Sequence, residues 1–294
     1  MKKIRAILIL LAGFLVLVAP KVWAQATPVP ESKAAKKLLK AGLKADKAGD
    51  WGTAFGYFQK AAGLKSPEGE YEVGRYYANG YGITIDTSQA VTWYQAAIAQ
   101  GNTDAMCALA GLYLTGHQLL ENDNMAFTLY SQAAALGDEK AQIQQADCYL
   151  NGWGTTQNQT LAFSTYQTLA DKGDQYAEYK VMGCLYAGTG TDKDIGKAVS
   201  ICRQLADAGD AEALNDMGNF YSGGEAGYDP SQAVSCYEKS AELGNADAQN
   251  NLGYCYWKAT GVAQDDSKAI YWFRKSADQG NQDSLTQWKA LTGQ

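Results

Sequence analysis

The chain has 294 residues, of which 46% are hydrophobic, and its 25 basic and 31 acidic side chains give a formal net charge of −6. An acidic chain lacks the broad basic face that displaces counterions from a phosphate backbone, so the composition argues against a nucleic-acid partner. Basic residues cluster only in the first few positions and between Lys33 and Lys40. The length fits either two ordinary domains or one elongated array.

Residues 1–24 have the three parts of a secretory signal. A basic start at residues 2–5 precedes an apolar run over residues 6–19, and Val22-Trp23-Ala24 ends in the small residue typical of a cleavage site. The run is shorter than the ~20 apolar residues that a membrane-spanning helix needs. We therefore expect cleavage after residue 24 and a periplasmic or secreted mature chain without a stable membrane span. An uncleaved anchor is the alternative.

The next two segments lead into the body of the chain. Residues 25–32 contain Pro28 and Pro30 and little apolar material, which indicates a flexible leader. Residues 33–65 carry two helical patterns separated by Gly49-Asp50, and we expect them to form an atypical first repeat.

A repeat of about 36 residues follows. Six glycines recur at intervals of 36, 36, 36, 35 and 36 residues, and each is followed by Asn or Asp. Glycine suits the left-handed position that ends a helix, and Asn or Asp suits the N-cap that starts the next one. Each dipeptide therefore closes one helix and opens another. The glycines are Gly101, Gly137, Gly173, Gly209, Gly244 and Gly280.

Each unit is expected to contain two helices. The first carries a small residue, an apolar residue and a tyrosine at four-residue steps, as in Ala248, Leu252 and Tyr256, which places all three on one helix face. After a glycine-rich loop, the second helix carries an alanine and, in most units, an aromatic residue four positions later. This second helix begins at a recurring N-cap, which is Asp86, Asn122, Asn158, Asp194, Asp229 or Asp265.

This pattern resembles the Sel1-like repeat (SLR) family, a relative of the tetratricopeptide repeats. The stretch NADAQNNLGYCYWKATGVAQDDSKAIYWFRKSADQG at 245–280 carries it most clearly; Cys202, which stands where other units have an aromatic residue, departs from it. The resemblance implies an all-α fold, namely an α/α solenoid that winds into a right-handed superhelix of about seven helix-turn-helix repeats of about 36 residues.

Six full units are expected over residues 66–280 as one uninterrupted array. Residues 281–294 are expected to form a helix that caps the last hydrophobic face, as terminal repeats require. The expected units are 66–101, 102–137, 138–173, 174–209, 210–244 and 245–280.

The sequence offers little for catalysis, and we expect no enzymatic activity, no cofactor and no metal. The one histidine, His117, lies in a loop beside Gly116, and a chain with a single histidine cannot build the common histidine-rich metal sites. The Gly-x-Gly pairs, such as Gly80 and Gly82, follow a helix, whereas phosphate cradles precede one. We interpret them as turns.

Six cysteines in an exported chain raise the question of disulfides. Cys236 and Cys255 lie at nearly equal distances from the Gly244-Asn245 turn, on successive antiparallel helices. We therefore expect them to face each other and to form a disulfide. Cys184 with Cys202 is the alternative pair.

The resemblance also implies that the first helices line the concave side of the superhelix. Tyrosine, tryptophan, arginine and asparagine are residue types that anchor and adapt interfaces. Where they occupy variable positions of this side we predict contact with a partner; packing between repeats is the alternative role. These positions are Tyr71, Arg75, Tyr179, Asn215, Asn219, Asn250, Tyr254 and Trp257.

The function implied by the resemblance is an exported adaptor or regulatory scaffold that binds a protein or peptide in the periplasm or cell envelope. Two alternatives remain. A cell-wall-directed hydrolase would need a nucleophile–base constellation, which the sequence does not display. A glycan-binding module would be favoured by exposed tryptophans such as Trp153 and Trp257.

Overall fold

The computed structural model describes residues 31–116 and 121–294, which form 15 α-helices and no strand. This confirms the predicted all-α solenoid of two-helix repeats. The signal segment 1–24, most of the leader 25–32 and His117 lie outside the described residues. The helices are α1 (Lys33–Lys47), α2 (Trp51–Gly63), α3 (Pro67–Asn79), α4 (Thr87–Ile98), α5 (Thr103–Thr115), α6 (Asp123–Ala135), α7 (Glu139–Asn151), α8 (Gln159–Ala170), α9 (Gln175–Ala187), α10 (Ile195–Asp207), α11 (Ala211–Gly223), α12 (Pro230–Glu242), α13 (Ala246–Lys258), α14 (Asp266–Asp278) and α15 (Gln282–Thr292).

The helices begin and end where the sequence predicts. Each recurring Asp or Asn before a second helix accepts a hydrogen bond from the backbone N–H three residues later, so all six act as N-caps. The six glycines between units have φ between 84° and 97°, the left-handed conformation expected after a helix. One glycine–Asx dipeptide thus joins each unit to the next.

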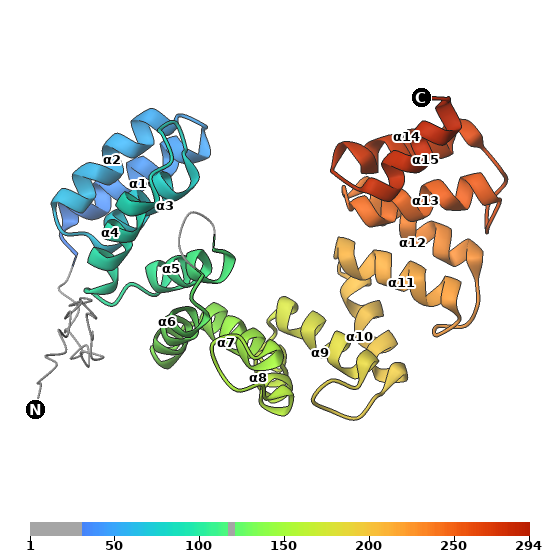
Figure 1. Cartoon of the computed structure of the whole chain (residues 1–294), viewed down its shortest axis with the longest axis horizontal. Coiled ribbons are helices and arrows are strands. Elements are labelled where there is room, and N and C mark those ends of the chain that lie inside the picture. Colours follow the sequence, from blue (N-terminus) through green and yellow to red (C-terminus); the bar gives the residue numbers. More distant parts are fainter. Residues whose placement is uncertain (1–30, 117–120) are drawn as a thin grey trace, which may run out of the picture. The chain divides into compact units, whose positions relative to one another are not determined.

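Inside a unit, the two helices pack through a pair of positions of complementary size. The aromatic residue of the second helix lies against a glycine of the first: a Cβ on Gly74 would stand 2.7 Å from the ring of Tyr94, and one on Gly253 2.8 Å from that of Phe273. The glycine lets the helices approach closely enough to bury the ring, and Phe273 is fully buried. The two helices of such a unit therefore lie side by side, as α3 and α4 do and as α13 and α14 do in Figure 1.

The unit with Cys202 in place of the aromatic residue reverses this arrangement. Met182 stands at the register position that Gly74 and Gly253 hold in their units, eight residues after the N-cap. Both Met182 and Cys202 are buried in the same hydrophobic cluster. The large side chain has moved to the first helix and the small one to the second, so the space between α9 and α10 stays filled.

In three units a glycine of the loop between the two helices contacts the preceding unit. Gly154 and Gly190 are the second glycines of Gly-x-Gly loops, and Gly261 lies in a loop that has Ala259 in place of the first glycine. A Cβ on Gly154, Gly190 or Gly261 would overlap a backbone carbonyl oxygen at the start of the preceding unit's second helix. All three glycines have positive φ. The glycine at this loop position is therefore required by a close backbone approach, which supports the interpretation of the Gly-x-Gly loops as turns.

The described residues divide into two compact units, and the division between Leu109 and Ala110 falls inside α5. The two-helix repeats continue through this boundary, and the expected domain bounds stay a prediction. The first compact unit has a core around Phe58 and Tyr76, in which α1 packs on α2 and α3 on α4. The second has two clusters, one between Ile143 and Phe220 and one between Ala233 and Phe273, and Trp288 of α15 packs against the latter.

Candidate partner-binding site

Most of the residues predicted to contact a partner form hydrogen bonds between successive first helices. Tyr179 of α9 donates from its hydroxyl to Oδ2 of Asp216 on α11, over 2.7 Å. Asn251 of α13 donates to Oδ1 of Asn215 on α11, at 3.0 Å, and Ser284 of α15 donates to Oδ1 of Asn250, at 2.6 Å. These polar contacts tie neighbouring repeats together.

In the first compact unit, Arg75 is held by a network of its own. Its Nη2 lies 2.9 Å from Oδ2 of Asp46, its Nε lies 2.6 Å from Oε2 of Glu72, and the guanidinium stands 5.3 Å from the ring centroids of Tyr76 and of Tyr81. Burial alone would lower the pKa of Arg75, but its bonds to Glu72 and Asp46 raise it. Arg75 therefore joins α3 to α1.

The remaining predicted residues also have partners inside the chain. The ring of Tyr71 lies 6.0 Å from that of Tyr94, and Asn219 accepts a hydrogen bond from the hydroxyl of Tyr237 at 2.9 Å. Tyr254 donates to Asp283 of α15, and the ring of Trp257 lies 5.9 Å from that of Tyr254. The packing role thus accounts for these side chains, and their contact with a partner stays a prediction.

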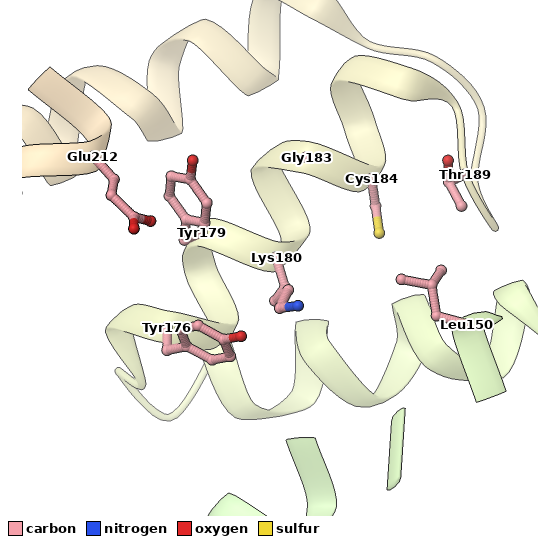
Figure 2. A pocket seen from close by; sticks show the side chains of 8 residues that line it. All are labelled: Leu150, Tyr176, Tyr179, Lys180, Gly183, Cys184, Thr189 and Glu212. Carbon is pink, nitrogen blue, oxygen red and sulfur yellow. The ribbon is translucent and has the colours of Figure 1, made fainter. Parts of the chain in front are cut away.

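A cavity of about 400 Å³ opens over one face of α9, and of the eight predicted residues only Tyr179 lines it. Figure 2 shows Tyr176, Tyr179, Lys180 and Cys184 along this face, with Glu212 of α11 on one side and Leu150 of α7 on another. Because the spacing along α9 is that of successive helical turns, one face of a single helix supplies most of the wall. We call this space the α9 cavity.

The α9 cavity exists because Gly183 has no side chain. Gly183 is the ninth residue after its N-cap, a position that Arg75, Asp147, Asn219 and Tyr254 occupy in other units. A Cβ at Gly183 would meet no atom within 4 Å, so the glycine faces open space. Sequence reasoning missed this site, although a mid-helix glycine where most units carry a larger side chain was the signal that could have revealed it.

The α9 cavity combines aromatic surface with separated charges. Lys180 places its Nζ 2.8 Å from Oδ1 of Asp147 and 5.1 Å from the ring centroid of Tyr176. Burial alone would lower the pKa of Lys180, but its bond to Asp147 raises it, so Lys180 stays charged and paired. Tyr176 is 50% exposed and Glu212 is exposed, so an aromatic face and a carboxylate are available to a ligand.

The thiols of Cys184 and Cys202 are buried in the second compact unit. Burial raises the pKa of Cys184 in the α9 cavity, and it raises that of Cys202 to about 12. The thiol of Cys202 donates to the carbonyl oxygen of Ala213 at 3.3 Å. A cysteine with a raised pKa is a poor nucleophile at neutral pH.

The expected disulfide between Cys236 and Cys255 is not formed, and this prediction is wrong. Both thiols are free, as are those of the alternative pair, Cys184 and Cys202. Cys236 packs against the cluster between Ile143 and Phe220, on the side of the preceding repeat, whereas Cys255 belongs to the next cluster. Equal distance from a turn places two residues at the same height along a helix pair, but it does not decide which way each side chain points.

The described residues contain neither a group of three or more His, Cys, Asp or Glu side chains suited to a metal ion nor a helix long and apolar enough to cross a bilayer. A second cavity, of about 590 Å³, lies on the side of the second helices, where Arg203, Cys236 and Lys239 are among its lining residues.

Comparison with known proteins decides the family. The Sel1 repeat model matches seven segments that together cover most of the chain. This chain belongs to the Sel1 repeat family. The matched segments are 52–66, 67–102, 103–138, 140–174, 176–210, 211–245 and 246–281. The array is therefore a Sel1 repeat scaffold, an architecture that typically mediates protein interactions.

Two solved structures of Sel1-like proteins resemble this Sel1 repeat chain. A Sel1 repeat protein from Oxalobacter formigenes is 28% identical, with a TM-score of 0.69 over 87% of this chain and 76% of that one. The protective antigen c5321 of uropathogenic Escherichia coli, which has an SLR fold, is also 28% identical, with a TM-score of 0.60 over 87% of this chain. The present chain spans 56% of the length of that antigen. The comparison with curated proteins found no match.

Proposed function

We propose that this Sel1 repeat protein is an exported scaffold that binds a segment of a protein partner in the periplasm or cell envelope, and that the α9 cavity receives one side chain of that segment. The observation that carries the proposal is the opening above Gly183, where most other units fill the same position. The chemistry of the wall supports it, because the exposed ring of Tyr176 offers apolar surface and the exposed Glu212 adds a polar group, as in small binding sites.

The titratable groups of the α9 cavity favour binding over catalysis. A nucleophilic thiol or a catalytic amine needs a lowered pKa, whereas the pKa values of Cys184 and Lys180 are both raised. Lys180 is, in addition, engaged with Asp147. These groups are arranged to hold a ligand rather than to transform one.

The binding proposal is tested by filling the α9 cavity without disturbing the helix. Gly183→Leu places a side chain into open space and replaces glycine by a better helix former, which favours the fold by about 1 kcal/mol. The matched control is Gly56→Leu in α2, where a Cβ also meets nothing within 4 Å. Affinity capture from an envelope extract identifies partners, and titration of the purified partner compares the variants.

We expect Gly183→Leu to lower the affinity for the partner about tenfold or more, which is a loss of about 1.4 kcal/mol of binding free energy. Gly56→Leu should bind the partner with the affinity of the unmodified chain. If both variants bind the partner with equal affinity, the α9 cavity does not receive a side chain of the partner. Capture of peptidoglycan fragments in place of a protein would support the glycan-binding alternative.

Export is tested separately. Cell fractionation followed by mass spectrometry of the N-terminal peptide should find the chain in the envelope or the medium, beginning at Gln25 if the signal is cleaved. A chain recovered from the cytoplasm with an intact N-terminus would contradict export and leave the test of the α9 cavity unaffected.

A further inference from the structure

The basic residues of α1 form a single stripe. Its six lysines follow one another at steps of one, three or four residues, and at about 100° per residue they fall within an arc of about 100° on the helix surface. All six are exposed. We call these residues the six-lysine stripe: Lys33, Lys36, Lys37, Lys40, Lys44 and Lys47.

Packing fixes the direction in which the six-lysine stripe points. The opposite side of α1 carries Ala35 and Gly42, which are buried, and a Cβ on Gly42 would overlap the ring of Phe58 on α2. Leu39 and Ala45 pack against the same core. Because α1 cannot rotate without separating from α2, the lysines are held on the outer surface.

The positive charge of the six-lysine stripe is not compensated by the fold. No ion pair among the described residues involves any of its lysines, and Asp46, the one acid of α1, is engaged with Arg75. Attraction to the helix C-terminus accounts for Lys44 and Lys47, which lie in the last turn, but not for the other four. In a chain of net charge −6, six of the 25 basic residues thus share one face of one helix.

The shape of the six-lysine stripe matches a charged plane better than a compact ligand. Its ammonium groups follow a line of about 20 Å, at 1.5 Å per residue, and neither of the two cavities described above is lined by them. At the edge of the stripe Leu43 is 45% exposed, which adds an apolar side chain to the row of lysine stems. Basic rows with an apolar edge are the pattern that binds anionic lipid headgroups at a membrane surface.

We propose that α1 binds the surface of an anionic phospholipid bilayer through the six-lysine stripe. The ammonium groups contact lipid phosphates, and Leu43 enters the headgroup region. This surface is separate from the α9 cavity, so either proposal can fail without the other.

The test measures co-sedimentation of the purified mature chain, residues 25–294, with vesicles. Vesicles of phosphatidylcholine containing about a third phosphatidylglycerol are compared with vesicles of phosphatidylcholine alone. The stripe variant carries Lys36→Gln, Lys40→Gln and Lys44→Gln. The control variant carries Lys140→Gln, Lys197→Gln and Lys289→Gln, which remove the same charge from exposed positions outside α1.

We expect the unmodified chain to bind the anionic vesicles only and to be released when the salt concentration is raised. The affinity for these vesicles should fall about fivefold for each stripe lysine removed. The control variant should bind them with nearly unchanged affinity. Equal binding to neutral and anionic vesicles would overturn the proposal, because an apolar segment would then be responsible. Equal weakening by both triple variants would overturn it as well, since net charge alone would explain the binding. Binding to duplex DNA or polyglutamate without vesicle binding would assign the stripe to a different partner.

Discussion

At the scale of single residues, glycines with the same left-handed backbone conformation have different structural roles in this array. Gly173 and Gly190 both have positive φ, of 89° and 71°. A Cβ on Gly173 would meet nothing within 4 Å, whereas one on Gly190 would overlap the carbonyl oxygen of Gln159 in the preceding repeat. The first glycine serves the turn alone, and the second also allows two repeats to touch.

The two glycines should therefore respond differently to alanine. Gly173→Ala should lower the free energy of unfolding by the ~1–2 kcal/mol that a left-handed conformation costs an alanine. Gly190→Ala should lower it by about 1–3 kcal/mol more, because the loop backbone must move away from the preceding repeat. Thermal unfolding followed by circular dichroism measures both changes. Equal melting temperatures for the two variants would show that the close approach contributes nothing.

Glu70 is a second residue whose surroundings predict a measurable effect. It is 2% exposed and accepts a hydrogen bond from Nε2 of Gln100 at 2.6 Å. Burial raises its pKa above the ordinary value of 4.5, although the bond to Gln100 acts in the opposite direction. The folded chain therefore binds a proton more tightly than the unfolded chain does, so this contribution to stability is complete below pH 4.5 and is lost as the pH rises through the raised pKa.

Glu70→Gln should remove that pH dependence. At pH 7 the variant should melt about 2–4 °C above the unmodified chain, because it buries no charge, and the two should converge as the pH falls towards 4.5. Melting curves recorded from pH 7 to pH 4.5 test this. A difference that widens towards acid would mean that the carboxylate is stabilised, not penalised, by its surroundings.

At the scale of helices, the exchange of sizes between α9 and α10 predicts a strong coupling. Cys202→Tyr alone should overpack the space beside Met182 and cost ~1–3 kcal/mol, and Met182→Ala alone should leave a cavity and cost ~2–5 kcal/mol.

Combined, the two substitutions recreate the Ala146 and Tyr166 pairing of the preceding repeat, and the double variant should be close to the unmodified chain in stability. A double-mutant cycle from thermal or urea unfolding measures the coupling free energy between positions 182 and 202. Strict additivity would show that the two side chains do not share one space.

The helices themselves could be predicted from the sequence because their signals are local. A cap such as Asp194 bonds a backbone N–H only three residues away, and a glycine such as Gly209 adopts its conformation without help from distant residues. The direction of Cys236 could not be predicted, because it depends on which face of α12 meets which neighbour. The α9 cavity likewise depends on how α7 and α11 flank Gly183.

At the scale of the whole molecule, the chain consists of two compact units whose cores are built from different helices. The α9 cavity and both clusters of the second unit lie between Ile143 and Trp288. Because each repeat is stabilised by its immediate neighbours, these parts do not require α1 to α4 for their packing.

We therefore predict that a fragment of residues 122–294, which starts at the N-cap of α6, folds by itself. Its helical circular dichroism should melt cooperatively, and it should bind the partner of the α9 cavity as the full chain does. It should not bind anionic vesicles, because it lacks α1. A fragment that is unfolded under conditions where the full chain is stable would contradict the independence of the second unit.

The reversed sizes of Met182 and Cys202 also restrict how the gene can rearrange. A crossover at a glycine–Asx junction such as Gly173-Asp174 would transfer both helices of a unit together. A crossover in the loop between α9 and α10 would instead join Met182 to a tyrosine or phenylalanine, or Cys202 to a glycine, and produce a crowded or a hollow repeat. We therefore expect residues 174–209 to be exchanged only as one block, whereas the helices of the units that pair glycine with an aromatic ring should tolerate exchange of a single helix.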